Sequence, residues 1–404
     1  MKLTYPPSKN IGIQDLEIKN ADQIKQSVRV VAQEIRDRDL SKEFDTLRKL
    51  PKDIVEQLRS AGVFRMNMPK IWGGPEMTPM DQTEVIETLS WGDASVGWCS
   101  FIWSDSGFYS GYLDDAVARE LYPKLDMAQS GWVFPAGMGH KVDGGYSLSG
   151  RFKFGSGVNH CDRLIGGFLV AENGVPILDD KGKPEWRVAI GKPEQFNILD
   201  TWYTMGLKGT GSTDYEADSI FIPQEHTFAF TDKAPREGSI WKKPNHFLRK
   251  MGGVPLGIAR DAIDSAIPIL QAKSDRFTGV AYKDSEVKQQ AIALAEGKLG
   301  AARAYVYESL TREWERLEAD EPLTDQELAA VMISRQQAFQ TCREVVQMMF
   351  DLVGADSIFA RNKLERLLRD INTACQHIVA QQRALTAPGG VLLGSEASRA
   401  NIFL

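Results

Sequence analysis

The sequence predicts an α+β fold in which a helical domain, a β domain and a helical bundle follow one another along 404 residues. Apolar residues recur at helical spacing near both ends of the chain, whereas the residues between them alternate with period two. The hydrophobic fraction of 43% and the charged fraction of 25% are those of a globular protein. We therefore predict an N-terminal helical domain over 1–129, a middle β-barrel or sandwich domain over 130–240, and a C-terminal four-helix bundle over 241–404.

Helical periodicity begins shortly after the N-terminus. Ile24, Val28, Val31 and Ile35 recur every three or four residues and predict one helix. The same spacing predicts a second helix that ends before Gly62, a loop over 66–77, and two further helices that include 83–89 and 96–102.

The middle of the chain has the pattern of strands. Residues 146–154 alternate between apolar and polar side chains after a Gly144-Gly145 turn signal. Short apolar runs at 164–170 and 217–222 predict further strands, the last of them closed by Pro223. Turn residues recur at short intervals, which is typical of a small barrel or sandwich.

The chain becomes helical again after Pro244. Long amphipathic segments cover 258–273, 285–318, 324–352 and 364–385, with short breaks between them. Helices of this length with short connections predict an antiparallel bundle.

Composition excludes several classes of protein. The net charge of −6 gives no reason to expect a nucleic-acid or membrane partner, and neither Met1–Asn10 nor any later stretch has the apolar run of a signal peptide or membrane span. The four cysteines are scattered, which fits a reducing cytoplasm, and no metal site is expected because His160 lacks a second ligand at metal spacing. No GxGxxG nicotinamide motif or Walker loop is present.

Three positions have residue types that suit chemistry. The Gly209–Ser212 turn and Ser156, between Gly155 and Gly157, could bring amides and hydroxyls close to a planar ligand or a phosphate, or could be simple turns that need glycine. At helical spacing His377 shares a face with Asp370, and a neutral imidazole there could exchange a proton, or could be an ordinary core residue.

Three segments carry a family resemblance, through their residues, their order and the predicted helical or strand character of the regions that contain them. They are Gly144–Gly157 (GGYSLSGRFKFGSG), Trp202–Ser212 (WYTMGLKGTGS) and Arg369–His377 (RDINTACQH). With them the chain, from Leu50 to Gly394, resembles the acyl-CoA dehydrogenase superfamily of flavoproteins, and more closely its two-component, reduced-flavin-dependent (group D) aromatic monooxygenase branch.

The resemblance implies roles for particular residues. Ser156 would lie at N5 of the flavin and stabilise a C4a-hydroperoxyflavin, and His377 would bind substrate and handle its proton. Arg276 would reach the flavin phosphate of a neighbouring subunit, and Gly354-Ala355 takes the place of a glycine pair that contacts the cofactor across that interface. The remaining implied flavin contacts are Phe134, Pro135, Ala136, Thr210, Gly211 and Ser212. The implied substrate contacts are Trp98, Trp103 and Ser106. Several hydroxylases carry a substrate-binding histidine a little after the tryptophan that corresponds to Trp98, and this chain has Ser106 in that region instead.

The same resemblance indicates which reaction to expect. Acyl-CoA dehydrogenases need a carboxylate to remove a substrate proton, but Ile378 stands at the usual position of that base and 245–250 contains no acid. The chain is therefore expected to be the oxygenase component of a monooxygenase that uses O2 and reduced flavin, FMNH2 in preference to FADH2, on an aromatic or heteroaromatic small molecule. A separate NAD(P)H-dependent flavin reductase would supply the flavin, and the protein would be a homotetramer. The alternatives are an acyl-CoA dehydrogenase or oxidase with an unconventional base, and a non-catalytic flavin-binding member of the fold.

Overall fold

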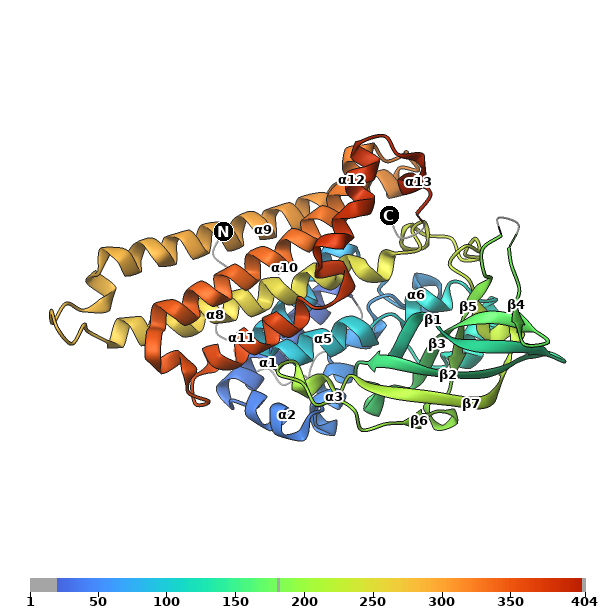
Figure 1. Cartoon of the computed structure of the whole chain (residues 1–404), viewed down its shortest axis with the longest axis horizontal. Coiled ribbons are helices and arrows are strands. Elements are labelled where there is room, and N and C mark those ends of the chain that lie inside the picture. Colours follow the sequence, from blue (N-terminus) through green and yellow to red (C-terminus); the bar gives the residue numbers. More distant parts are fainter. Residues whose placement is uncertain (1–19, 180–181, 402–404) are drawn as a thin grey trace.

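The computed structural model describes residues 20–179 and 182–401, so Met1–Asn10 lies outside the described residues. Helices of the N-terminal part, a β-sheet and a set of long C-terminal helices pack together, with the sheet at one end and the long helices at the other (Figure 1). The predicted α+β fold class is confirmed, and the predicted domain limits stay predictions.

Two helices of the N-terminal part, α4 and α5, are almost entirely buried. They pack against each other, and α4 also packs against α1 and α8. Asn20 and Gln23 form a capping box that begins α1 (Ala21–Asp37), whose predicted apolar face of Ile24, Val28, Val31 and Ile35 is completely buried. The other helices of this part are α2 (Ser41–Leu47), α3 (Lys52–Ser60), α4 (Pro79–Gly92), α5 (Ala94–Trp103), α6 (Ser106–Ser110) and α7 (Asp115–Leu121).

The predicted strands lie in one mixed sheet with the order β6-β7-β2-β1-β3-β5-β8, and β4 pairs with β3. Strands β1 and β3 are parallel, and the other pairs are antiparallel. The register of β1 shifts on both sides of Pro135, which has no N–H to donate to the ladder. The strands are β1 (Gln129–Val142), β2 (Gly145–Gly155), β3 (Arg163–Glu172), β4 (Val175–Pro176), β5 (Trp186–Gly191), β6 (Asn197–Ile198), β7 (Thr213–Pro223) and β8 (Thr227–Phe228).

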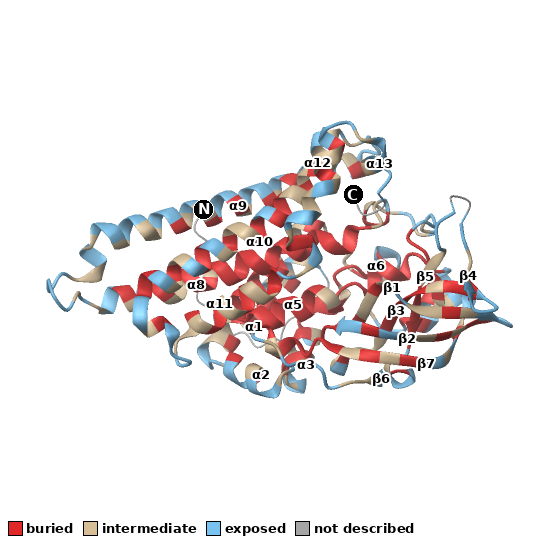
Figure 2. Cartoon of the chain, in the orientation of Figure 1, coloured by how far each residue is buried: buried red, intermediate tan, exposed pale blue. Residues whose placement is uncertain are grey.

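Four long helices form the C-terminal bundle and bury the faces that they turn toward one another and toward α5 (Figure 2). They are α8 (Gly253–Ala272), α9 (Glu286–Glu318), α10 (Asp325–Val353) and α11 (Lys363–Ala374), followed by the short helices α12 (Thr386–Leu392) and α13 (Glu396–Arg399). None of the helices in the described part of the chain is long and apolar enough to cross a membrane.

The predicted helix over 364–385 is too long, because α11 ends at Ala374. After Ala374 the N–H groups of Gln376 and His377 bond to carbonyl groups three residues back instead of four, and the backbone of His377 is extended. His377 then caps a short 3₁₀ helix, Ile378–Ala380. The spacing had suggested that His377 shares a helix face with Asp370, but His377 lies beyond the end of α11, so the two residues do not share one.

Candidate active site

A continuous chain of hydrogen bonds joins two of the three predicted segments, Gly144–Gly157 and Trp202–Ser212, to α5. The Trp98 Nε1–H donates to the Ser156 oxygen at 3.0 Å, and the Ser156 and Ser212 hydroxyl oxygens lie 2.7 Å apart. The Ser212 and Thr210 oxygens are 2.6 Å apart, and the Thr210 hydroxyl donates to the Leu207 carbonyl at 2.7 Å. All three hydroxyl groups belong to buried residues.

This chain can run in only one direction. A carbonyl oxygen only accepts, so the Thr210 hydroxyl donates its hydrogen to the Leu207 carbonyl. The Thr210 oxygen must therefore accept the hydrogen bond from the Ser212 hydroxyl. Ser212 then has no proton left for Ser156, so Ser156 donates to Ser212. Since Trp98 already donates to the Ser156 oxygen, that oxygen keeps one lone pair for a further N–H or O–H donor. The chain therefore presents Ser156 to a ligand as an acceptor.

The backbone around Ser156 is held in place by close contacts. Gly157 has φ +70° and donates its N–H to the Thr210 carbonyl at 2.9 Å, and a Cβ at this position would lie 2.3 Å from the Trp103 ring. Phe154 also has a positive φ, of +60°, which is unusual for a bulky residue. The Ser130 hydroxyl donates to the Ser156 carbonyl at 2.7 Å. Backbone strain beside a buried hydroxyl is typical of a functional site.

His377 packs edge-on against Trp98, with ring centroids 5.6 Å apart. Burial, and then the positive charge of Arg335, lower the pKa of His377 to about 4, so the imidazole is neutral at pH 7. Its Nδ1 accepts from the Val379 N–H at 3.4 Å, which places the single proton of the neutral ring on Nε2. The ring therefore offers an N–H donor close to Trp98.

Two predicted substrate contacts are instead engaged with the main chain. Trp103 is completely buried and donates its Nε1–H to the Gly157 carbonyl at 3.2 Å. Ser106 is also completely buried and donates to the Met127 carbonyl at 2.7 Å. Trp103 therefore supports the backbone next to Ser156, and no hydrogen bond joins Trp103 or Ser106 to Trp98 or His377 in the described part of the chain.

The predicted flavin contacts on β1 form an accessible edge. Pro135 and Ala136 are exposed at the register shift, and Phe134 is half-buried with its ring stacked on Trp186. Phe154 is 53% exposed beside Trp132 and Trp202, at ring centroid distances of 6.0 and 6.4 Å. This aromatic edge can accept the face or edge of a planar ring.

Arg276, Gly354 and Ala355 lie at the other end of the molecule. Arg276 is in the exposed connection between α8 and α9, and Gly354 ends α10, both at the end of the bundle farther from the sheet (Figure 1). Lys273 and Asp356 form an ion pair that joins the two connections. Within one chain these three residues are therefore not brought together with Ser156.

Carboxylates near the site are already engaged. Asp370 accepts the Leu207 N–H at 2.6 Å, and burial, with the nearby charges of Asp93 and Asp45, raises the pKa of its carboxyl to about 7. Asp93 caps α5 through the Ser95 and Val96 N–H groups. In the described part of the chain, no carboxylate bonds to Trp98, Ser156, Thr210, Ser212 or His377.

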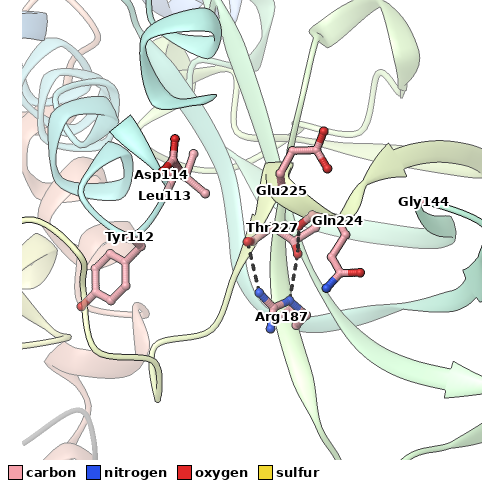
Figure 3. A pocket seen from close by; sticks show the side chains of 8 residues that line it. All are labelled: Tyr112, Leu113, Asp114, Gly144, Arg187, Gln224, Glu225 and Thr227. Carbon is pink, nitrogen blue, oxygen red and sulfur yellow. Dashed lines mark hydrogen bonds between the residues drawn. The ribbon is translucent and has the colours of Figure 1, made fainter. Parts of the chain in front are cut away.

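An open pocket of about 480 Å³ lies elsewhere, between Tyr112–Asp114 and the turn from Gln224 to Thr227 (Figure 3). Arg187 crosses its floor and donates to the Thr227 hydroxyl at 2.8 Å and to the Thr227 carbonyl at 3.2 Å. None of the predicted site residues lines it, so this pocket is separate from the Ser156 chain.

The sequence did not single out the Trp98 N–H as the donor to Ser156, nor Ser130 as its support. A tryptophan and a serine in apolar surroundings have the composition of an ordinary core. The one available signal was that three small hydroxyl residues, Ser156, Thr210 and Ser212, occur beside glycines in two separate motifs.

Comparisons with known proteins identify the family of this chain. The family model of the acyl-CoA dehydrogenase N-terminal domain matches residues 19–120, and that of the acyl-CoA dehydrogenase C-terminal domain matches residues 250–382. The indole-3-acetate monooxygenase of Acinetobacter baumannii is 30% identical over 368 residues, which cover 90% of this chain and 92% of that protein. The HsaA oxygenase subunit of a flavin-dependent monooxygenase from Rhodococcus jostii is 26% identical, over 84% of this chain and 90% of that protein.

The comparison with solved structures shows the same fold. The crystal structure of 3-HSA hydroxylase from Rhodococcus sp. RHA1 matches with a TM-score of 0.84 and 23% identity, over 92% of this chain and 97% of that chain. With the two family models and the relative of 30% identity, these findings show that the chain belongs to the acyl-CoA dehydrogenase family and is an enzyme of its flavin-dependent monooxygenase branch.

Proposed function

We propose that the protein is the oxygenase component of a two-component system, in which it binds reduced flavin, FMNH2 in preference to FADH2, and uses O2 to oxygenate an aromatic or heteroaromatic small molecule. The observation that carries the proposal is the one-directional hydrogen-bond chain that ends at Ser156, next to Trp98 and His377, to which no carboxylate of the described residues bonds.

The residues fit a reduced flavin. A reduced isoalloxazine carries a hydrogen on N5, and the free lone pair of Ser156 is suited to accept that N–H. Thr210, Gly211 and Ser212 form the turn beside it, and Phe134, Pro135 and Ala136 supply the exposed edge of β1. When bound, the reduced flavin supplies the electrons that activate O2.

His377 is suited to manage a proton close to the reacting oxygen. Its low pKa keeps the ring neutral, and its Nε2–H can donate to a substrate oxygen or to the leaving oxygen. The apolar walls formed by Trp98 and Phe101 on α5 would exclude water from this point. Substrate would therefore lie against Trp98 and His377, while Trp103 and Ser106 would hold the wall rather than bind substrate.

The remaining flavin contacts require a second subunit in this proposal. The bundle end that carries Arg276, Gly354 and Ala355 also exposes apolar side chains: Phe277 is 99% exposed, Ile358 62% and Phe359 44%. A neighbouring subunit that covered this surface would bring Arg276 to the phosphate of its flavin, which fits a homotetramer. A separate NAD(P)H-dependent reductase in the same cytoplasm would supply the flavin, as the name of the Rhodococcus jostii relative suggests by calling that chain an oxygenase subunit.

The test combines the protein with a flavin reductase, NADH, O2 and either FMN or FAD. Indole-3-acetate is the first substrate to try, because the 30% identical relative is named for it. The proposal predicts a product that contains one atom from ¹⁸O₂, and a higher yield with FMN than with FAD. Formation of hydrogen peroxide alone with every aromatic compound tried would indicate a non-catalytic member, and reduction of a bound oxidised flavin by an acyl-CoA would indicate a dehydrogenase.

A further inference from the structure

A cluster of buried charged side chains adjoins the candidate active site. It consists of Arg249, Lys250, Glu313, Arg335 and Asp105, each at most 3% exposed, and we call it the buried charge cluster. Arg249 and Lys250 lie on the 3₁₀ helix His246–Gly252, Glu313 on α9, Arg335 on α10 and Asp105 between α5 and α6.

Two ion pairs account for both acids of this cluster. Arg249 holds Glu313 with two hydrogen bonds, of 2.5 and 2.6 Å, in the fork geometry of arginine and carboxylate. Lys250 forms an ion pair with Asp105, which also accepts from the Asn67 amide at 3.1 Å. Three cations and two carboxylates leave one positive charge in excess.

The excess charge is that of Arg335. Its guanidinium donates from Nη1 to the Leu248 carbonyl at 3.1 Å, and its Nε has no hydrogen-bond partner among the residues that the structure describes. Burial and the charge of Arg249 lower the pKa of Arg335 to about 9, while Glu313 raises it. The half-buried Lys243 adds further positive charge near Arg249 and Glu313. A buried cation with unused donors is costly unless an anion binds to it.

Arg335 adjoins the part of the site formed by His377 and Trp98. The segment that carries His377 is fastened to α10 beside Arg335: the amides of Gln336 and Gln340 donate to the Ala380 carbonyl at 3.4 and 2.6 Å. The charge of Arg335 also acts directly on the His377 ring. An anion bound at Arg335 would therefore belong to a molecule that also contacts His377.

We propose that Arg335 binds the carboxylate of an anionic aromatic substrate whose ring lies against Trp98 and His377. A carboxylate fits because it is planar, accepts two parallel N–H bonds from a guanidinium and carries the single negative charge that balances the cluster. The inference rests on the proposed function for the reaction, although binding at Arg335 does not require turnover. Arg335 would then select the substrate, while Ser156 and His377 serve the reaction itself.

The test compares two ligands that share a ring, indole-3-acetate and 3-methylindole, which lacks the carboxylate. Their Kd values are measured by calorimetry, anaerobically and with reduced FMN present, for the natural protein, Arg335→Gln and Arg335→Lys. Arg163→Gln is the matched control, because Arg163 on β3 also donates one bond to a backbone carbonyl and has a buried Nε without a partner. Loss of a charge-assisted pair is expected to raise the Kd for indole-3-acetate about 10- to 100-fold in Arg335→Gln.

The other expected results follow from the chemistry of the side chains. Arg335→Lys keeps the positive charge but loses the pair of parallel N–H donors, so it should weaken indole-3-acetate binding by a smaller factor. If Arg335→Gln does not fold, the comparison of the two ligands is made with Arg335→Lys instead. Binding of 3-methylindole should stay within about twofold of the natural protein in both variants, and Arg163→Gln should resemble the natural protein with both ligands.

Equal weakening of both ligands, or no weakening of indole-3-acetate, would overturn the inference. The outcome is separable from that of the proposed function. Selective loss of carboxylate binding together with hydrogen peroxide as the only product would refute the oxygenase proposal alone. Equal oxygenation of both compounds by the natural protein and Arg335→Gln would refute the role of Arg335 alone.

Discussion

Replacing His377 by glutamine should make the protein lose less stability in mild acid. Burial keeps the folded-state pKa of His377 at about 4, whereas an unfolded histidine has a pKa of about 6.5. As pH falls below about 6.5, the unfolded chain takes up a proton that the folded site excludes, so the free energy of unfolding decreases, and the loss is complete only below about pH 4. Above about pH 6.5 both states are neutral at this residue and His377 contributes no pH dependence.

The size of the effect follows from the same two values. At pH 5 the penalty is about 2 kcal/mol, and its limit at lower pH is about 3 kcal/mol. Asp370, whose pKa is raised to about 7, acts in the opposite sense, because the folded protein binds its proton more strongly than the unfolded chain. Comparison of each variant with the natural protein at the same pH removes this contribution and that of the other histidines.

Urea unfolding at pH 7.5 and pH 5, followed by tryptophan fluorescence, measures this difference. The natural protein should lose about 2 kcal/mol more than His377→Gln between the two pH values. Gln376→Ala, an exposed neighbour, is the control and should behave as the natural protein does. Equal losses in His377→Gln and the natural protein would refute the conclusion that the folded site excludes the imidazolium ion.

Three further predictions concern the candidate site. Ser156→Ala should shorten, at least about tenfold, the lifetime of the absorbing species that forms when the reduced-flavin enzyme meets O2, because the acceptor for the flavin N–H is lost. Ser100→Ala is the control and should leave that lifetime unchanged, because the buried Ser100 hydroxyl has no hydrogen-bond partner among the described residues. Equal decay in both variants would remove Ser156 from the chemistry. His377→Ala should consume reduced flavin at the normal rate but release more hydrogen peroxide than product, and full coupling in a product-to-NADH assay would contradict its proton role. Gly157→Ala should lower the free energy of unfolding by at least about 2 kcal/mol more than Gly144→Ala, since both have positive φ but only Gly157 has an indole ring 2.3 Å from the new Cβ; equal melting temperatures would contradict this packing.

Local patterns predicted most of the fold. The apolar stripe of α1 and the alternation in β2 depend on neighbouring residues alone, and both elements form where their periodicity indicates. The parallel pairing of β1 with β3 was not predicted, because a sequence pattern marks a strand but not its partner. The end of α11 was missed because an apolar period continues past Ala374, although the backbone changes there to three-residue hydrogen bonds and an extended His377.

In the candidate site, too, local patterns indicate some residues, and only tertiary contacts reveal others. Ser156 and the Thr210–Ser212 turn could be found because glycines beside small hydroxyl residues are unusual in a core, and the structure joins them by hydrogen bonds. Arg335 could not be found from the sequence, since one arginine in an amphipathic helix has the pattern of a solvated face. Its burial depends on α9 and on the 3₁₀ helix before α8, which pack against α10 from distant parts of the chain. Tertiary contacts alone reveal such a residue.

Rapid mixing of the protein and FMNH2 with oxygenated buffer tests most directly the claim that this site activates O2 rather than dehydrogenating a thioester. We expect a transient spectrum, distinct from those of reduced and oxidised FMN, that lasts seconds or longer and decays faster when the aromatic substrate is added. Direct appearance of oxidised FMN and hydrogen peroxide, at the rate seen with free FMNH2, would contradict the claim that this site activates O2.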